Sequence, residues 1–169
     1  IKIRTMENPN HIAYWQALGA NPTPADFSEL YMSLEQGTLD AQENPYDLIV
    51  ANKLYEPQAY VIETNHLLHT LNMVGSKATY DALPADIQQL VSECAAEAHQ
   101  YARQMADEGI EGQKSTIQDA VLEIITLEPA MIQEMADVSA NVYDLVREQI
   151  GTDLVDSLLA QVETASVAE

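Results

Sequence analysis

Basic residues are scarce in this sequence of 169 residues, which has 7 Lys and Arg against 27 Asp and Glu and a formal net charge of -20. This balance excludes a nucleic-acid partner, because binding a phosphate backbone requires a basic surface that releases counterions. The acidic residues are unevenly distributed along the sequence, with 10 in positions 1–85 and 17 in positions 86–169. A solvated acidic surface explains this excess, and an acidic module that binds a basic partner is the alternative.

Cysteine and long apolar runs are also nearly absent. Cys94 is the only cysteine, so an internal disulfide is excluded. The apolar runs are a few residues long, far short of the roughly 20 that span a bilayer. The chain opens with Ile1 inside what reads as a strand, so we expect it to be the rest of a longer, processed or truncated protein. Hydrophobic residues make up 47% of it, which favours a folded core over disorder.

The sequence lacks the common enzymatic motifs, including glycine-rich phosphate loops, a nucleophile elbow and a metalloprotease helix. His66 and His69 are three residues apart, which on a strand places them on opposite faces, so we expect no metal and no cofactor. Asp40 and Glu43 flank a short turn and could act as paired carboxylates. They keep open the alternative of a small α/β enzyme that acts on an organic acid.

The first half of the chain has the periodicity of alternating strands and helices. Ile1 and Ile3 fall on one face of a strand and Arg4 on the other. Strands that alternate with helices of about ten residues predict parallel βαβ units. The expected elements are a strand over 1–5, a helix over 11–18 opened by Asn8 and Pro9, a turn over 20–24, a helix over 26–37 with Phe27, Leu30, Tyr31 and Leu34 on its core face, a short strand over 38–42 and a helix over 44–54.

The second half is dominated by one long helical pattern. Residues 60–76 are rich in β-branched and apolar residues and predict a long or bent strand. A continuous apolar stripe then predicts a helix from Pro84 to Asp107, roughly 36 Å long at about 1.5 Å per residue and weakened beyond that by two glycines. A short strand over 123–127 and two amphipathic helices divided near Gly151 complete the expected elements.

Arg4 is the most informative single residue before any family is considered. It is one of few basic residues and lies near the C-terminal end of the first predicted strand, where open α/β sheets bind their ligands. Its guanidinium could grip a carboxylate with two parallel hydrogen bonds. An ordinary surface pair with an acidic side chain is the competing interpretation.

Seven short blocks of sequence favour the ligand-binding role. They occupy residues 3–9, 17–24, 27–31, 36–37, 40–45, 53–56 and 64–66. In this order and spacing they resemble the dicarboxylate-binding solute receptors of tripartite ATP-independent periplasmic (TRAP) transporters. The resemblance implies a periplasmic, two-lobed receptor that closes on an organic acid and delivers it to a membrane permease. It also implies that most of the N-terminal lobe has no counterpart in this chain.

The same resemblance suggests roles for five residues. It implies that Arg4 clamps the ligand carboxylate, Phe27 forms an apolar wall and Asn44 hydrogen-bonds the ligand or Arg4. Glu7 falls at a variable pocket position, and His66 falls at a supporting histidine behind the pocket.

We therefore expect an α/β fold, a lobe like that of type II periplasmic binding proteins, without catalytic activity. Residues 1–76 would form the ligand-binding lobe, 77–128 a lobe-spanning helix with a short strand, and 129–169 the C-terminal helices. The expected partners are an organic-acid carboxylate, the permease subunits and either a missing N-terminal lobe or a second copy of this chain.

Overall fold

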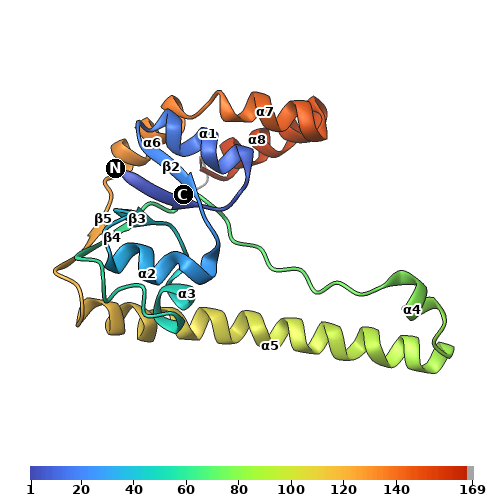
Figure 1. Cartoon of the computed structure of the whole chain (residues 1–169). Coiled ribbons are helices and arrows are strands. Elements are labelled where there is room, and N and C mark those ends of the chain that lie inside the picture. The colour runs from blue at the N-terminus through green and yellow to red at the C-terminus, as the bar shows by residue number, and fades with distance from the viewer. Residues whose placement is uncertain (167–169) are drawn as a thin grey trace.

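The computed structural model describes residues 1–166 as two small parallel sheets covered by helices. In Figure 1, α1, α6, α7 and α8 lie on one side of the sheets, and α2, α3 and the C-terminal part of α5 lie on the other. The elements are β1 (Lys2–Thr5), α1 (Pro9–Ala17), β2 (Asn21–Pro24), a 3-10 turn (Phe27–Glu29), α2 (Leu30–Glu35), β3 (Ala41–Gln42), α3 (Tyr46–Ala51), β4 (Tyr60–Glu63), α4 (Lys77–Asp81), α5 (Ala85–Gln118), β5 (Glu123–Thr126), α6 (Pro129–Val138), α7 (Val142–Ile150) and α8 (Thr152–Ser166).

The predicted parallel pairing is confirmed in the first sheet. The first has the strand order β2-β1-β3 and the second pairs β4 with β5, all in parallel. Helix α1 begins as predicted, because the Asn8 side chain accepts hydrogen bonds from the backbone N–H groups of Asn10 and His11. It ends before Gly19, which takes the left-handed φ of 80° that glycine adopts without strain.

Strand β2 was not predicted, because its two prolines indicate a turn. In the structure it forms the edge of the sheet, where proline is tolerated. The N–H of Asn21 donates to the carbonyl of Ile1 at 2.8 Å and that of Ala25 donates to Thr5 at 3.4 Å. Pro22 and Pro24 fall at the alternate positions, whose backbone faces away from β1, so their missing N–H groups cost the sheet no hydrogen bond.

The hydrophobic core lies beneath the sheets and is closed by the C-terminal end of α5. Its buried members come from α2, α3, the loops that flank them and α5, and Leu30 is completely buried. Phe27 departs from the predicted core face and is 36% exposed. The 3-10 turn before α2 rotates it out of the helical register. The buried residues are Leu30, Leu34, Leu39, Ile49, Leu54 and Ile117.

Helix α5 is longer than predicted and continues through Gly109 and Gly112 to Gln118, a length of 34 residues. Two interior glycines cost a helix about 1 kcal/mol each. The burial of Ile117 against α3 and the core stabilises the turns that follow them. The helix is about 51 Å long at about 1.5 Å per residue.

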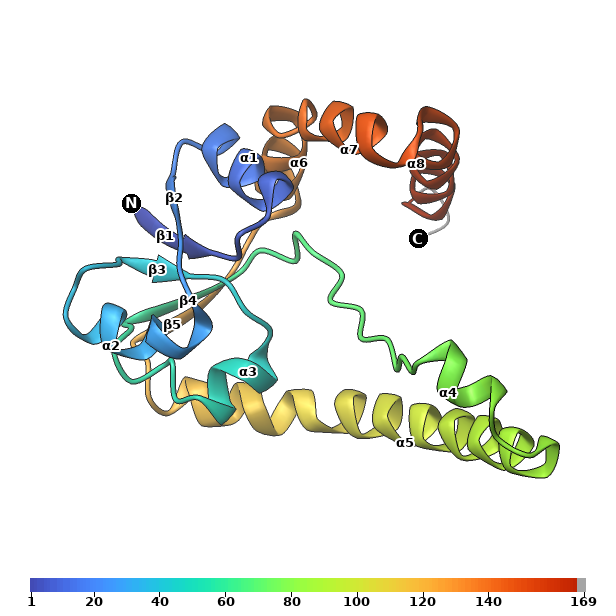
Figure 2. The same ribbon diagram turned by 45° about the vertical axis from the view of Figure 1, so that its right-hand side comes forward.

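Residues 68–108, which we call the arm, extend away from the remainder of the chain, which we call the body. Figures 1 and 2 both show the N-terminal part of α5 reaching beyond the sheets with α4 beside its far end, while the coil before α4 runs apart from α5. No residue of the arm is buried. The predicted strand over 60–76 is wrong beyond Glu63, because no strand in the described part of the chain pairs with residues 64–76.

The C-terminal region contains three helices where two were predicted. The extra break follows Ser139, whose hydroxyl donates to the carbonyl of Met135 at 2.7 Å and closes α6. Gly151 separates α7 from α8 as expected, with a φ of 96°. Helix α7 packs on α1, where the side-chain amides of Asn10 and Gln149 donate to each other. Residues 167–169 of the predicted C-terminal segment lie outside the described residues.

Within residues 1–166, no helix is both long enough and apolar enough to cross a membrane.

Candidate functional site

Arg4 is a buried cation near the C-terminal end of the central strand of the first sheet. The residue is 5% exposed, and its Nε donates to the carbonyl of Ala25 at 2.9 Å. Its guanidinium carbon lies 5.7 Å from the centre of the Phe27 ring, within cation–π range. Among the described residues, no carboxylate forms an ion pair with Arg4. The terminal nitrogens of the guanidinium are therefore left to bind another acceptor.

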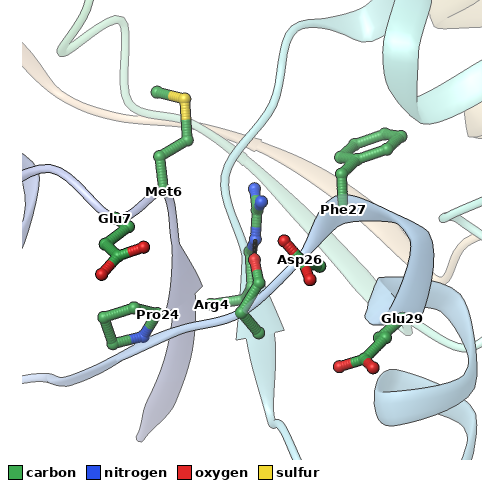
Figure 3. Close-up of a pocket in the computed structure, with 8 residues that line it drawn as sticks. Arg4, Met6, Glu7, Pro24, Asp26, Phe27 and Glu29 are labelled. Atoms are coloured by element: carbon green, nitrogen blue, oxygen red, sulfur yellow. Dashed lines mark hydrogen bonds between the residues drawn. The ribbon is translucent and has the colours of Figure 1, made fainter.

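A cavity of about 550 Å³ opens over this guanidinium. Figure 3 shows Arg4 with Glu7 to one side and Asp26 to the other, and Met6 and Phe27 near its tip. The residues that line the cavity are Arg4, Met6, Glu7, Pro24, Ala25, Asp26, Phe27 and Glu29. Three of the five predicted site residues, Arg4, Glu7 and Phe27, therefore share one cavity.

Sequence reasoning missed Met6, Asp26 and Glu29 as part of this cavity. Met6 follows Arg4 by two residues, a spacing that puts both on the same face of an extended chain, so this signal was present. The side chain of Asp26 forms no capping hydrogen bond at the 3-10 turn that follows it. Both Asp26 and Glu29 are exposed to the cavity because the 3-10 turn carries them beside the end of β2.

Asn44 does not line the Arg4 cavity. Its side-chain amide donates to Oε1 of Gln42 at 2.5 Å, and the Gln42 amide in turn donates to Oε1 of Gln58 at 3.2 Å. Gln42 lies opposite Arg4 in the register of β1 and β3. The expected hydrogen bond between Asn44 and Arg4 is absent from the described residues, and Gln42 stands next to Arg4 in the sheet instead.

His66 lies in a second cavity, of about 330 Å³, between α1 and α7. Its ring stacks on Tyr14 with the centroids 5.1 Å apart, and Nδ1 is 2.7 Å from Oγ1 of Thr64. Its Nε2 is buried without a hydrogen bond, although the Glu43 carboxylate is 3.6 Å away, close enough to attract a protonated ring. The pKa of Tyr14 is raised to about 12, mainly by burial and to a smaller extent by the nearby Tyr143.

The residues proposed for acid–base chemistry do not share partners. Oδ2 of Asp40 accepts a hydrogen bond from the backbone N–H of Lys2 at 2.7 Å. Glu43 lies between His66 and His11, whose Nδ1 is 3.7 Å from the carboxylate. In the part of the chain that the structure describes, no three His, Cys, Asp or Glu side chains come together as a metal site.

Glu63 joins the second sheet to α3 and α5. Its carboxylate accepts hydrogen bonds from Nζ of Lys114 at 2.6 Å, Oγ1 of Thr126 at 2.6 Å and the Tyr46 hydroxyl at 2.8 Å. These bonds, led by those from Lys114 and Thr126, lower the pKa of Glu63 to about 2 against the opposing effect of burial. The cluster fixes the C-terminal end of α5 to β4, β5 and α3.

The family model of the bacterial extracellular solute-binding proteins, family 7 (DctP), matches residues 1–149. The chain belongs to this family. The 2,3-diketo-L-gulonate-binding periplasmic protein YiaO of Escherichia coli K12 is 36% identical over 126 residues, which are 75% of this chain and 38% of that protein. The resemblance inferred from the seven sequence blocks is thus confirmed.

Solved structures agree with this assignment. A TRAP periplasmic solute-binding protein of Shewanella oneidensis with bound succinate has a TM-score of 0.83 and 30% identity, and the match covers 95% of this chain and 53% of that one. The ectoine-binding protein of the TeaABC TRAP transporter of Halomonas elongata also has a TM-score of 0.83 and 30% identity, covering 96% and 55%. The chain thus spans about half of these solved relatives, and its fold is the α/β fold of solute-binding receptors.

Proposed function

We propose that this chain is one lobe of an extracytoplasmic receptor that captures an organic acid and delivers it to a TRAP-type permease. The observation that carries the proposal is the buried, unpaired guanidinium of Arg4 at the base of an open cavity. Its terminal nitrogens reach the open cavity and have no carboxylate partner in the described residues, so a ligand carboxylate that enters would accept two charge-assisted hydrogen bonds from them.

The other predicted residues would contribute in different ways. Phe27 would cover the ligand's carbon skeleton while its ring also contacts the guanidinium. Glu7 would contact polar groups of the ligand, since it lines the same cavity. Asn44 would act through Gln42, which it hydrogen-bonds. His66 would hold α1 and the loop after β4 in place from the second cavity.

Closure by a second lobe is part of the proposal, because the chain spans about half of its solved relatives. The cavity is open to solvent, so an ion pair formed there by this chain alone would remain solvated and weak, about 0–1 kcal/mol. A covering lobe would exclude water and strengthen it. The relatives named above as periplasmic or TRAP proteins support a periplasmic location and a permease as partner.

Incubation of the full-length gene product with a mixture of organic acids tests this function. A receptor returns every acid unchanged and gains thermal stability from at least one of them. Turnover of any acid would support the enzyme alternative through Asp40 and Glu43, and indifference to all of them would support the acidic interaction module. Native mass spectrometry of the protein purified from its host would weigh any ligand that remains bound.

A further inference from the structure

The Arg4 cavity has an uneven distribution of charge between its floor and its rim. Arg4 is 5% exposed at the floor, whereas Glu7, Asp26 and Glu29 are exposed side chains that line the same cavity. Glu7 and Asp26 flank Arg4 in Figure 3, and Glu29 lies farther along, beyond Asp26. None of the three forms an ion pair with a basic side chain in residues 1–166.

This arrangement has a direct consequence for the two ends of a ligand. An ionised carboxylate on the protein can only accept hydrogen bonds, so the rim favours ligand groups that donate them. A second carboxylate on the ligand would approach the negative charges of Glu7, Asp26 and Glu29. Arg4, the cation of the cavity, would already be bound to the first carboxylate. At the effective dielectric of a protein surface, like charges a few ångströms apart repel by several kcal/mol, and closure of the cavity would increase this repulsion.

From this geometry we infer that the ligand carries a single carboxylate, bound by Arg4, and hydrogen-bond donors, either hydroxyl or ammonium groups, at its other end. A dicarboxylate of the same length is discriminated against by the acidic rim. The inference rests on the proposed function, in which Arg4 anchors the ligand, and it narrows the class of acid that the site accepts. Met6 and Phe27, the apolar members of the lining, would contact the carbon chain between the two ends.

Isothermal titration calorimetry on the full-length gene product tests the inference with two matched pairs of ligands. The first pair is 4-hydroxybutyrate and succinate, and the second is gluconate and glucarate. Within each pair the carbon count is constant and one terminal hydroxymethyl group is replaced by a carboxylate. We expect the monocarboxylate to bind at least about tenfold more tightly in at least one pair and the dicarboxylate to be favoured in neither.

Variants locate the source of this preference. The double substitution Glu7→Gln and Glu29→Gln removes two rim charges while keeping the side-chain shapes, and it should reduce the preference for the monocarboxylate by about threefold or more. Glu35→Gln removes one exposed acidic charge on α2 that does not line the cavity, and it should change the preference by less than about twofold. Equal effects of the rim and control variants would overturn the inference.

The two proposals fail in different ways. Suppose that a dicarboxylate binds as tightly as the monocarboxylate of its pair and that Arg4→Ala abolishes binding. The proposed carboxylate-binding function is then supported and the single-carboxylate inference is wrong. If a ligand binds with unchanged affinity to Arg4→Ala, Arg4 is not the anchor and both proposals are wrong. If none of the four ligands binds to the wild-type protein, the inference is wrong, and the thermal-stability screen with mixed acids decides the proposed function separately.

Discussion

The body and the arm are built from similar proportions of apolar residues but differ in what covers them. In the body, Leu30 is completely buried between α2, α3 and α5, and the polar cluster at Glu63 ties two strands to two helices. In the arm, Leu90 is 53% exposed on α5 and Val74 is 87% exposed in the coil before α4. The comparison shows that the body has its own core, whereas the arm leaves its large apolar side chains exposed.

In the described part of the chain, the side-chain hydrogen bonds of the arm join residues that are close in sequence. The hydroxyl of Tyr80 donates to the carbonyl of Gln88 at 3.0 Å and lies 2.7 Å from Oγ of Ser92, which seats α4 on the first turns of α5. Lys77 and Asp81 form an ion pair within α4 that is exposed and worth little. These contacts fix α4 against α5 but leave the apolar stripe of α5 open.

The largest expected difference between the two regions concerns core truncation. Leu30→Ala should lower the free energy of unfolding of the 169-residue chain by about 3 kcal/mol, because it leaves a cavity at a completely buried position of the hydrophobic core. The matched control, Leu90→Ala in the arm, should change it by less than about 0.5 kcal/mol. Urea denaturation measures both. Equal losses would show that the arm is packed in solution.

Ligand recognition should also depend on the body and not on the arm. In the full-length protein, Arg4→Lys should weaken binding of an organic acid by about 2 kcal/mol, because an ammonium cannot form the paired hydrogen bonds of a guanidinium. Arg103→Lys on the exposed face of α5 is the matched control and should leave the affinity unchanged. Calorimetry that finds the same affinity for Arg4→Lys and the parent would remove Arg4 from the site.

The stability of the body should fall at acidic pH through Glu63. Its pKa in the folded protein, about 2, lies below the ordinary value of 4.5, so the unfolded chain binds the proton more readily. The stabilisation is fully present above about pH 4.5 and is lost as the pH falls through 2. A pKa shift of this size corresponds to a contribution of about 3 kcal/mol to the free energy of unfolding if Glu63 is fully shielded from water. Partial solvation of the carboxylate reduces this contribution to about 1.5 kcal/mol.

Comparison of the parent chain with Glu63→Gln isolates this contribution from the other carboxylates. Urea denaturation at pH 6.5 and pH 3 should show that the parent loses about 1 kcal/mol more stability on acidification than the variant does. An identical pH dependence in the two proteins would mean that the hydrogen bonds to Lys114 and Thr126 are not maintained in solution.

The smallest expected effect concerns self-association of the chain by itself. The exposed stripe on α5 should draw two copies together, and light scattering should give a mass above that of the monomer. Leu90→Lys should shift this equilibrium towards the monomer by placing a charge within the stripe, while Gln100→Lys on the same helix serves as the control for added charge. A strictly monomeric parent chain would contradict the expectation.

Local signals made much of the fold predictable. The alternation of apolar and polar residues identified β1, and the Asn8–Pro9 pair identified the start of α1. The helical spacing of apolar residues identified α5. The strand predicted after Glu63 failed because a strand requires a partner, which sequence alone does not supply. At the site, scarcity and position singled out Arg4 but left a surface ion pair as the competing interpretation, and the family resemblance favoured the ligand-binding role. The lack of an ion pair at Arg4 depends on how β2 and the 3-10 turn meet β1, which is a tertiary property.

Pro22 and Pro24 also determine how the first sheet can grow. On the outer side of β2 these two positions offer carbonyl oxygens but no N–H donors, so an incoming strand from another molecule would find half of its hydrogen bonds unavailable. The opposite edge is β3, which is two residues long. Because one edge lacks donors and the other is short, the sheet resists edge-to-edge aggregation although the chain exposes many apolar side chains elsewhere. A second copy of this chain would therefore contact the first sheet through side-chain packing and not by extending it.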